Sequence, residues 1–342
     1  MQELKKPLLK LHNLKTFFPI KSGFLGKNTK YVQAVNDINL TIYKGETLGL
    51  VGESGCGKTT LGKTIVGLYQ PTEGEMLYDF SGSEKDLVKL SKEDKDLARR
   101  KIQIVFQDPH SSLNPSFTIY QSLSDPLKKF GLKTKEERRK VIGDLLEAVN
   151  MRREYMDRYP HEFSGGQRQR IGIARALCIN PELVICDEAV SALDVSIQAQ
   201  VLNLLKQLKE DLNLTYIFIT HDLSVVEYIS DRIAVMYLGK ILELSDAEQL
   251  YKYPIHPYTK ALLSAIPVVD VKRDRKRILL EGDVPSPVNP PSGCHFHGRC
   301  KQCDEICKTT IPDVHVFEIE GQEHSVMCHF AQRNYDKLLK GE

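Results

Sequence analysis

The fold of this 342-residue chain is decided by the stretch GESGCGKT at residues 52–59. This stretch fits the pattern G-x-x-x-x-G-K-S/T at every fixed position. The apolar run at 47–51 predicts a buried strand directly before it, and residues 60–68 predict a helix directly after it. A glycine-rich loop between a strand and a helix indicates an α/β fold.

The glycines of this loop indicate what it can bind. Because glycine adopts backbone conformations that other residues avoid, successive N–H groups can face one point, where the dipole of the following helix adds positive charge. That point suits a phosphate group, so the loop predicts a nucleotide site of the P-loop type. Lys58 would reach the β- and γ-phosphates, and the Thr59 hydroxyl would bind Mg²⁺. The residues expected to contact the nucleotide here are Gly52, Ser54, Gly55, Cys56, Gly57, Lys58, Thr59 and Thr60.

Length and charge limit the possible classes of protein. A chain of 342 residues is long for one domain, so we expect a nucleotide-binding domain at 1–253 and a smaller domain at 254–342. The net charge is +2 with 27% charged residues, and the two signs are interspersed. This balance gives no field that would favour nucleic acid as a partner.

No segment of the sequence predicts a membrane span. Residues 1–7 are not followed by an apolar stretch of signal-peptide length, and nowhere do about 18 apolar residues follow one another. We therefore expect the chain to stay in the cytosol and not to cross a bilayer itself.

Two further regions have a clear secondary-structure pattern. Residues 8–50 alternate apolar and polar positions in short runs, which predicts an antiparallel strand set. Residues 111–160 are predicted to form a helical subdomain. Phe18 lies in the first region and could stack on an adenine ring, but spacing alone favours a plain core position equally.

Gln107 follows a predicted strand at 102–106 and precedes Asp108 and Pro109. The carboxyl ends of strands in an open α/β sheet border the ligand crevice. Gln107 is therefore a candidate for contact with the metal ion or the attacking water, although this signal alone is weak.

A second candidate anion site is the sequence FSGGQRQR at 163–170, which leads into a predicted helix at 171–178. A serine and two glycines ahead of a helix can offer backbone N–H groups to an anion. An ordinary helix cap is the alternative, and without the P-loop it would be preferred. The candidate residues are Ser164, Gly165, Gly166 and Gln167.

Three more candidates follow buried strands. Asp187 and Glu188 end the apolar run 183–186, where an aspartate can hold Mg²⁺ through water and a glutamate can polarise the attacking water. The sequence SALD at 191–194 then predicts a turn. His221 follows the strand predicted at 215–220, and its position beside phosphate-directed elements favours a catalytic role over a structural one.

Taken in order, these motifs resemble the full set of an ABC-type ATPase, and the resemblance covers about residues 8–250. It implies a P-loop α/β core with an antiparallel β subdomain, a helical subdomain and a small Cys/Pro-rich C-terminal domain. It also implies that two such domains pair head to tail, so that the SGGQ sequence of one closes over the ATP held by Lys58 of the other. By the same resemblance, Phe18 would stack on adenine, Gln107 would sense Mg²⁺ and couple to a membrane subunit, and His221 would contact the γ-phosphate near Glu188.

Shorter strings narrow the subgroup. The ATPases of peptide and nickel importers are resembled by four strings, at 106–109, 112–115, 159–163 and 256–263. The string from 282 to 294 is most similar to the F-type ATPase subunit of oligopeptide/dipeptide importers. This resemblance implies a sister ATPase as partner in a heterodimer, two integral membrane permease subunits and an external substrate-binding protein. The chain would lie at the cytoplasmic face of the membrane.

The tail has its own composition. Eight of the 16 prolines lie at or beyond Pro254, and five of the eight cysteines lie at or beyond Cys294. Four thiolates suit a [4Fe-4S] cluster or a tetrahedral zinc ion, and spacing does not decide between them. Buried reduced cysteines are an equal alternative. The resemblance selects Cys294, Cys300, Cys307 and Cys328 as ligands and leaves Cys303 over; the alternative ligands are His295, His297, His324 and His329.

Several functions remain open at this level. The favoured one is an ATPase that powers peptide import, with nickel or another small solute as the alternative cargo. A soluble ABC protein that acts on ribosomes or DNA, or that scaffolds iron–sulfur assembly, is a second hypothesis. Translation-type members usually carry two cassettes and repair-type members a long coiled coil, and the sequence shows neither. A small-molecule kinase would leave the SGGQ and SALD sequences unexplained.

Overall fold

The computed structural model describes residues 6–22, 28–108, 113–266 and 277–340. The chain forms two compact units, each assembled from separate stretches of sequence. The first unit comprises residues 1–6, 43–46 and 89–219, and the second comprises 7–42, 47–88 and 220–342.

The first unit contains three parallel strands. β7 (Leu183–Asp187) lies between β6 (Ile102–Val105) and β8 (Thr215–Ile219), with Ile185 opposite both Ile104 and Ile217. Every residue of β7 and β8 is buried. Their continuous apolar sequences fit this position, because parallel strands are usually covered on both faces.

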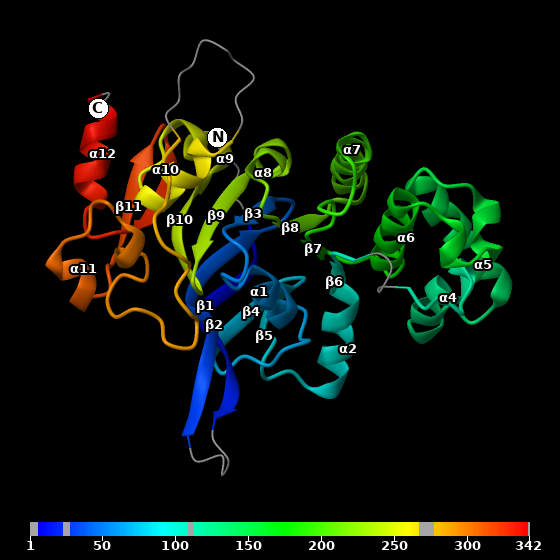
Figure 1. The fold of residues 1–342 in the computed structure, drawn as a ribbon. Coiled ribbons are helices and arrows are strands. Elements are labelled where there is room, and N and C mark those ends of the chain that lie inside the picture. Colours follow the sequence, from blue (N-terminus) through cyan, green and yellow to red (C-terminus); the bar gives the residue numbers. More distant parts are fainter. Residues whose placement is uncertain (1–5, 23–27, 109–112, 267–276, 341–342) are drawn as a thin grey trace. The chain divides into compact units, whose positions relative to one another are not determined.

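Helices make up most of the rest of the first unit, and α4, α5 and α6 pack on one another (Figure 1). Threonine side chains and capping boxes begin α4 and α5, at Thr118 and Thr134. The predicted helical subdomain is therefore observed. The helices are α2 (Lys92–Lys101), α4 (Ile119–Lys129), α5 (Lys135–Ala148), α6 (Gly165–Leu177) and α7 (Val195–Leu212).

The start of α6 differs from the sequence-based expectation. The helix begins at Gly165, six residues before the predicted start at Ile171. The Ser164 hydroxyl accepts a hydrogen bond from the Gln167 N–H, and the Gln167 side chain bonds back to the Ser164 N–H. This capping box favours helix formation despite two glycines of low helix propensity.

The second unit includes a four-stranded sheet in the order β2-β1-β4-β5, coloured blue to cyan in Figure 1. β1 pairs with β4 and β4 pairs with β5, both antiparallel. Apolar side chains such as Leu9, Leu11 and Ile42 are buried. An antiparallel strand set is thus confirmed for β1, whereas residues 47–50 of the predicted range belong to the strand that precedes the P-loop. The strands are β1 (Pro7–Ser22), β2 (Asn28–Tyr43), β4 (Glu73–Phe80) and β5 (Ser83–Asp86).

A second set of strands in this unit carries the P-loop. β3 (Thr47–Val51), which precedes the loop, pairs in parallel with β9 (Arg232–Tyr237). β10 (Lys240–Asp246) is antiparallel to β9, and β12 (Gln322–Met327) is antiparallel to both β10 and β11 (Val314–Ile319). Strands from the tail therefore continue the same run of hydrogen-bonded strands as the P-loop strand.

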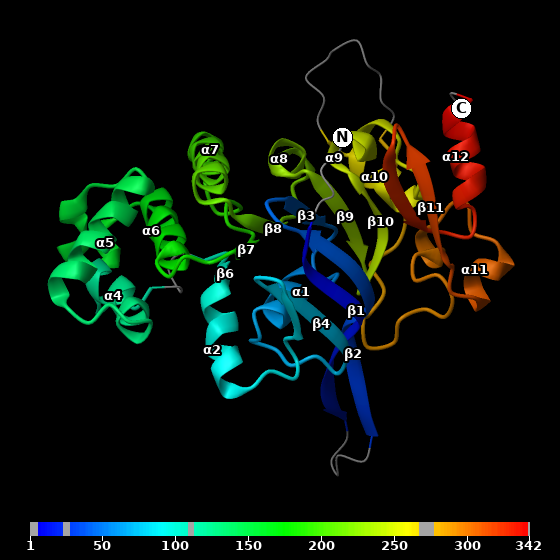
Figure 2. The same cartoon turned by 180° about the vertical axis from the view of Figure 1, so that it is seen from behind.

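Short helices surround these strands. At the C-terminal end, α12 lies beside the β11–β12 hairpin (Figure 2), where the rings of Phe317 and Tyr335 are 4.7 Å apart. The helix after the P-loop begins at Lys58 and ends at Ile65, whereas the sequence predicted 60–68. The helices are α1 (Lys58–Ile65), α8 (Leu223–Ile229), α9 (Ala247–Lys252), α10 (Pro257–Ser264), α11 (Glu305–Thr309) and α12 (Ala331–Leu339).

One apolar core joins the P-loop strand to the tail. Val51 and Val235 belong to the same buried cluster as Tyr258, Phe296 and Cys307. The predicted division of the chain after residue 253 does not interrupt this cluster, and the separate C-terminal domain stays a prediction.

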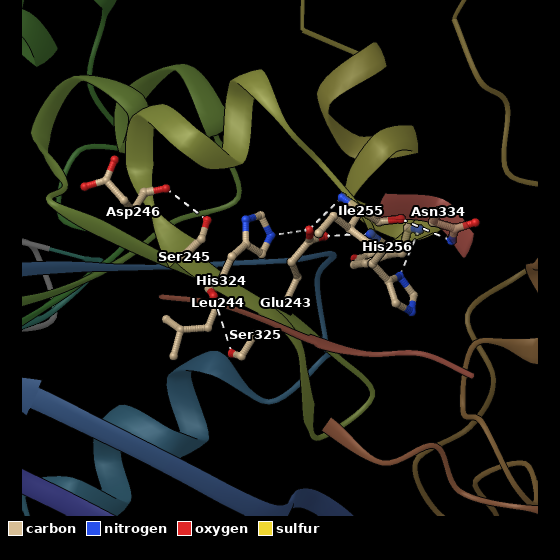
Figure 3. A network of polar contacts seen from close by, with 10 residues as sticks. Glu243, Leu244, Ser245, Asp246, Ile255, His256, His324, Ser325 and Asn334 are labelled. Carbon is tan, nitrogen blue, oxygen red and sulfur yellow. Dashed lines mark hydrogen bonds and ion pairs between the residues drawn. The ribbon is translucent and has the colours of Figure 1, made fainter. Parts of the chain in front are cut away.

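A buried polar network fixes the start of α10 (Figure 3). The Glu243 carboxylate accepts hydrogen bonds from the N–H groups of Ile255 and His256 and lies 2.7 Å from His324 Nε2. Burial lowers the pKa of His256 to about 4, so this imidazole is neutral at neutral pH and its Nδ1 accepts the Tyr258 N–H. The network therefore fixes the backbone from which Tyr258 projects.

Within the described ranges, no helix combines the length and the apolar character that crossing a membrane would require.

Candidate ATP-binding and hydrolysis site

The P-loop has the backbone that its glycines predict. Gly52, Gly55 and Gly57 all have positive φ angles, of 152°, 78° and 109°. A Cβ atom on Gly52 would lie 2.0 Å from the carbonyl oxygen of Met236, and one on Gly57 would lie 1.9 Å from that of Ala34. Both positions therefore require glycine for space as well as for conformation.

The loop ends in a helix whose N-terminus carries no side-chain cap. Gly57 is the N-cap residue of α1, and no side chain among the described residues caps the helix there. The first N–H groups of a helix need hydrogen-bond acceptors, and phosphate oxygens can supply them. Ser54 and Gly55 are exposed, whereas Thr59 and Thr60 on the first turn are half-buried.

Lys58 is held inside the loop. Its side chain is buried, and its ammonium donates to the carbonyl oxygens of Gly52 at 2.7 Å and Glu53 at 3.0 Å. The Cys56 thiol lies 3.7 Å from the same nitrogen, and burial raises its pKa. A cation that is already fixed in the loop can meet an anionic ligand with little loss of side-chain entropy.

Phe18 lies on β1 in the same unit as the P-loop. It is half-buried, and its ring meets that of Tyr69 edge-on with centroids 5.1 Å apart. The side chain is thus neither fully in the core nor free in solvent, and its role in stacking on adenine stays a prediction.

In the first unit, two carboxylates end β7 as expected. Asp187 is 2% exposed, and Glu188 is half-buried with a left-handed φ of 48°. Such a conformation costs of order 1 kcal/mol for a residue other than glycine and is often found at functional sites. The Glu188 N–H donates to Ile219 O at 2.9 Å, and its carbonyl accepts from the Ser191 hydroxyl at 3.0 Å. These bonds keep the strained residue in place.

The structure brings Gln107 and Glu188 together. The Gln107 side-chain amide donates to the Glu188 carboxylate over 2.7 Å, across 81 residues of sequence. Both residues follow neighbouring parallel strands, β6 and β7. Pro109 lies outside the described residues, as does Ser112 of the string at 112–115.

The SGGQ sequence is accessible. Ser164 and Gly165 are exposed, and Gly166 and Gln167 are half-buried. Ser164, Gly166 and Gln167 line a hollow together with the cationic side chains of Arg152 and Arg170. An exposed helix N-terminus beside two arginines suits contact with an anion from another molecule. His221 is also exposed, two residues beyond the end of β8.

Three hydrogen bonds of the P-loop residue Glu53 were missed by the sequence-based reasoning. Arg299 makes a bidentate ion pair with Glu53, through Nη1 at 2.6 Å and Nη2 at 3.1 Å. The Tyr258 phenol oxygen accepts the Glu53 N–H at 2.9 Å. Glu53 occupies a variable position of the P-loop pattern, so the pattern gives no reason to look for its partners. The partners lie 205 and 246 residues further along the chain.

The tail cysteines lie in buried or half-buried positions. Cys294, Cys307 and Cys328 are buried and Cys300 is half-buried. Burial raises the pKa of Cys294 to about 12 and that of Cys300 to about 11, so these thiols are protonated at neutral pH. Within the part of the chain that the structure describes, no group of three or more His, Cys, Asp or Glu residues is arranged to hold a metal ion.

Comparison with known proteins places these features in a family. A family model described as "ABC transporter" matches residues 35–191, and one described as "Oligopeptide/dipeptide transporter, C-terminal region" matches 242–307. The oligopeptide transport ATP-binding protein AppF of Bacillus subtilis is 51% identical over 328 residues, covering 95% of this chain and 98% of that protein. The chain belongs to the ABC transporter ATP-binding proteins of the oligopeptide/dipeptide transporter family. OppF of Salmonella typhimurium is 47% identical, covering 95% of this chain and 97% of that protein.

Solved structures agree with this membership. The ATP-binding cassette MJ0796, in a dimeric post-hydrolysis state bound to ADP and phosphate, superposes with a TM-score of 0.60 and 31% identity. The match covers 70% of this chain and 99% of that one. As an ABC ATPase, this family member is an ATP hydrolase that uses ATP and Mg²⁺. The family membership therefore favours the transport ATPase over the small-molecule kinase and the soluble ABC protein.

Proposed function

We propose that this chain powers the import of peptides across the cytoplasmic membrane by binding and hydrolysing ATP. One observation carries the proposal. The same chain contains a P-loop whose helix has no side-chain cap at its N-terminus and a C-terminal region that matches the oligopeptide/dipeptide transporter model. The names of the relatives support peptide as the cargo over nickel or another small solute.

The chemistry proposed here is the one that the resemblance to ABC-type ATPases implies for these residues. The P-loop and Lys58 hold the β- and γ-phosphates, and Thr59 and Asp187, with Gln107, would hold Mg²⁺, which neutralises phosphate charge when bound. Glu188 accepts a proton from the attacking water as its oxygen bonds to the γ-phosphorus. The bond from that phosphorus to the bridging oxygen breaks, and ADP and phosphate leave.

The remaining site residues contact other parts of this nucleotide or the nucleotide of a partner subunit. Phe18 stacks on the adenine, and His221 contacts the γ-phosphate. Ser164, Gly165, Gly166 and Gln167 serve a second ATPase subunit, and the exposure of Ser164 and Gly165 supports contact with its nucleotide. We take this second subunit to be a sister ATPase in a heterodimer.

Membrane subunits complete the proposed assembly. The relatives named as peptide transport ATP-binding proteins support an assembly in which other chains form the path of the peptide. Two integral permease subunits and an extracytoplasmic substrate-binding protein would supply the path and the selectivity. The chain would then be a peripheral protein on the cytoplasmic face, where closure and reopening of the ATPase pair drive the permeases.

Replacing Lys58 by alanine tests the proposal in cells. Loss of the ammonium that lies on the loop carbonyls should weaken ATP binding and abolish uptake of labelled oligopeptide, while the chain still sediments with membranes. Lys337→Ala, at an exposed lysine on α12, is the control and should leave uptake unchanged. Wild-type peptide uptake by the Lys58→Ala strain would contradict the proposal, as would failure of the wild-type chain to sediment with membranes.

The cysteine ligands stay a separate proposal. Burial raises the pKa of Cys294 most, and the neighbouring thiols of Cys300, Cys307 and Cys328 add to that rise, so the four residues lie in one region of the tail, which supports a common site. A [4Fe-4S] cluster, with zinc as the fallback, would require these side chains to turn toward one point. Iron, zinc and sulfide analysis of anaerobically purified protein measures this directly. A stoichiometric metal that is lost in Cys307→Ser but kept in Cys303→Ser is expected, and metal-free wild-type protein would refute the assignment.

A further inference from the structure

The P-loop of this chain carries its own negative charge. Glu53 is the second residue of GESGCGKT, and its carbonyl oxygen lies 3.0 Å from the Lys58 ammonium. Its side-chain carboxylate therefore belongs to the same loop that must bind the negatively charged triphosphate. Left uncompensated, it would repel the phosphates, since unit charges a few ångströms apart interact strongly when partly shielded from water.

Arg299 neutralises this carboxylate from the tail of the chain. Its guanidinium makes two parallel bonds to both Glu53 oxygens, at 2.6 and 3.1 Å. The Arg299 side chain is only 8% exposed and the Glu53 side chain 29%, so water screens the pair less than it would an open surface pair. The ion pair raises the pKa of Arg299, which keeps it charged.

A cluster of aromatic rings holds Arg299 in this position. The guanidinium carbon lies 5.9 Å from the centre of the Tyr237 ring, which lies 4.8 Å from that of Tyr258 and 5.3 Å from that of Phe296. Tyr258 also accepts the Glu53 N–H. The tail thus contacts both the backbone and the side chain of one P-loop residue.

We propose that Arg299 is a positioning residue for ATP binding, which orients and neutralises the P-loop carboxylate of Glu53 so that the loop can accept the triphosphate. The proposal rests on the assignment of residues 52–59 as the phosphate site. It gives the C-terminal region a direct part in the affinity for nucleotide. Arg299 acts through Glu53 and makes no contact with ATP itself.

Paired substitutions test this role. Arg299→Gln leaves Glu53 unpaired and should raise the Kd for a non-hydrolysable ATP analogue roughly tenfold at low salt. The double variant Glu53→Gln/Arg299→Gln removes the offending charge as well and should bind within about threefold of wild type. The Kd of Arg299→Lys should lie between those of Arg299→Gln and the double variant, because lysine keeps the positive charge without the bidentate geometry. The effect on ATP hydrolysis should appear in KM and not in kcat.

The controls separate this role from a structural one. Arg333→Gln, at another arginine of the tail that packs on a ring, should leave the Kd unchanged. The penalty of Arg299→Gln should shrink at high salt, because screening weakens charge repulsion and not packing. Equal Kd values for Arg299→Gln and the double variant would overturn the proposal. Should Lys58→Ala bind the analogue normally, the phosphate site itself would be misassigned, which is a different failure.

Discussion

Glu188→Gln is expected to bind ATP normally and to lower kcat for hydrolysis by roughly 10²- to 10⁴-fold, the range for loss of a general base. Glutamine has nearly the shape of glutamate and can still meet the Gln107 amide, which now lies 2.7 Å from the carboxylate. It cannot accept the proton that the attacking water must lose. This variant should therefore keep its affinity for ATP while losing most of its hydrolysis rate.

The measurements follow from that separation. The rate of phosphate release gives kcat. Size-exclusion chromatography in the presence of ATP shows whether the variant accumulates as a closed dimer, which in the wild type opens again after hydrolysis. Glu210→Gln, an exposed position on α7, is the control and should behave as wild type in both. Normal hydrolysis by Glu188→Gln would remove this residue from the role of base.

Much of this site was predictable because its signals are local. The P-loop, the two carboxylates after β7 and the SGGQ helix start each depend on a few adjacent residues, and the physical reason for each residue type can be stated from the chain alone. The strand at 47–51 was predicted with its observed bounds, and the observed β7 ends at Asp187, one residue before the end of the predicted strand at Glu188. Helix ends were predicted less well, since capping by Ser164 and the conformation of Gly57 moved two helix starts.

Long-range contacts were not predictable from the same patterns. The ion pair of Arg299 with Glu53 joins residues that are 246 positions apart, and an isolated sequence gives no sign of which charges meet. The pairing of β12 with β10 likewise depends on the fold of the whole tail, because short alternating strands do not specify their neighbours. Cysteine spacing fitted a shared metal site and buried reduced cysteines equally, because whether side chains converge is set by backbone geometry.

Ser164→Arg should abolish most ATP hydrolysis while ATP binding to the isolated chain stays unchanged. Ser164 begins α6 at an exposed surface, beside the positive end of a helix, and this is where we place the partner subunit's γ-phosphate. An arginine there blocks approach and removes the hydroxyl, and loss of one such donor typically lowers kcat by roughly 10²- to 10³-fold. Ser164→Thr keeps the cap, which is worth about 1 kcal/mol, and serves as the control.

Mixing variants then shows where the residues meet. If two copies of this chain pair head to tail, a dimer of one Lys58→Ala and one Ser164→Arg subunit contains one site with both residues intact, so two inactive proteins should recover activity when mixed. If the partner is a sister ATPase, Ser164→Arg should inactivate the heterodimer, and mixing should restore nothing. Full activity of Ser164→Arg in either assembly would mean that the SGGQ turn, although exposed, does not complete a neighbouring nucleotide site.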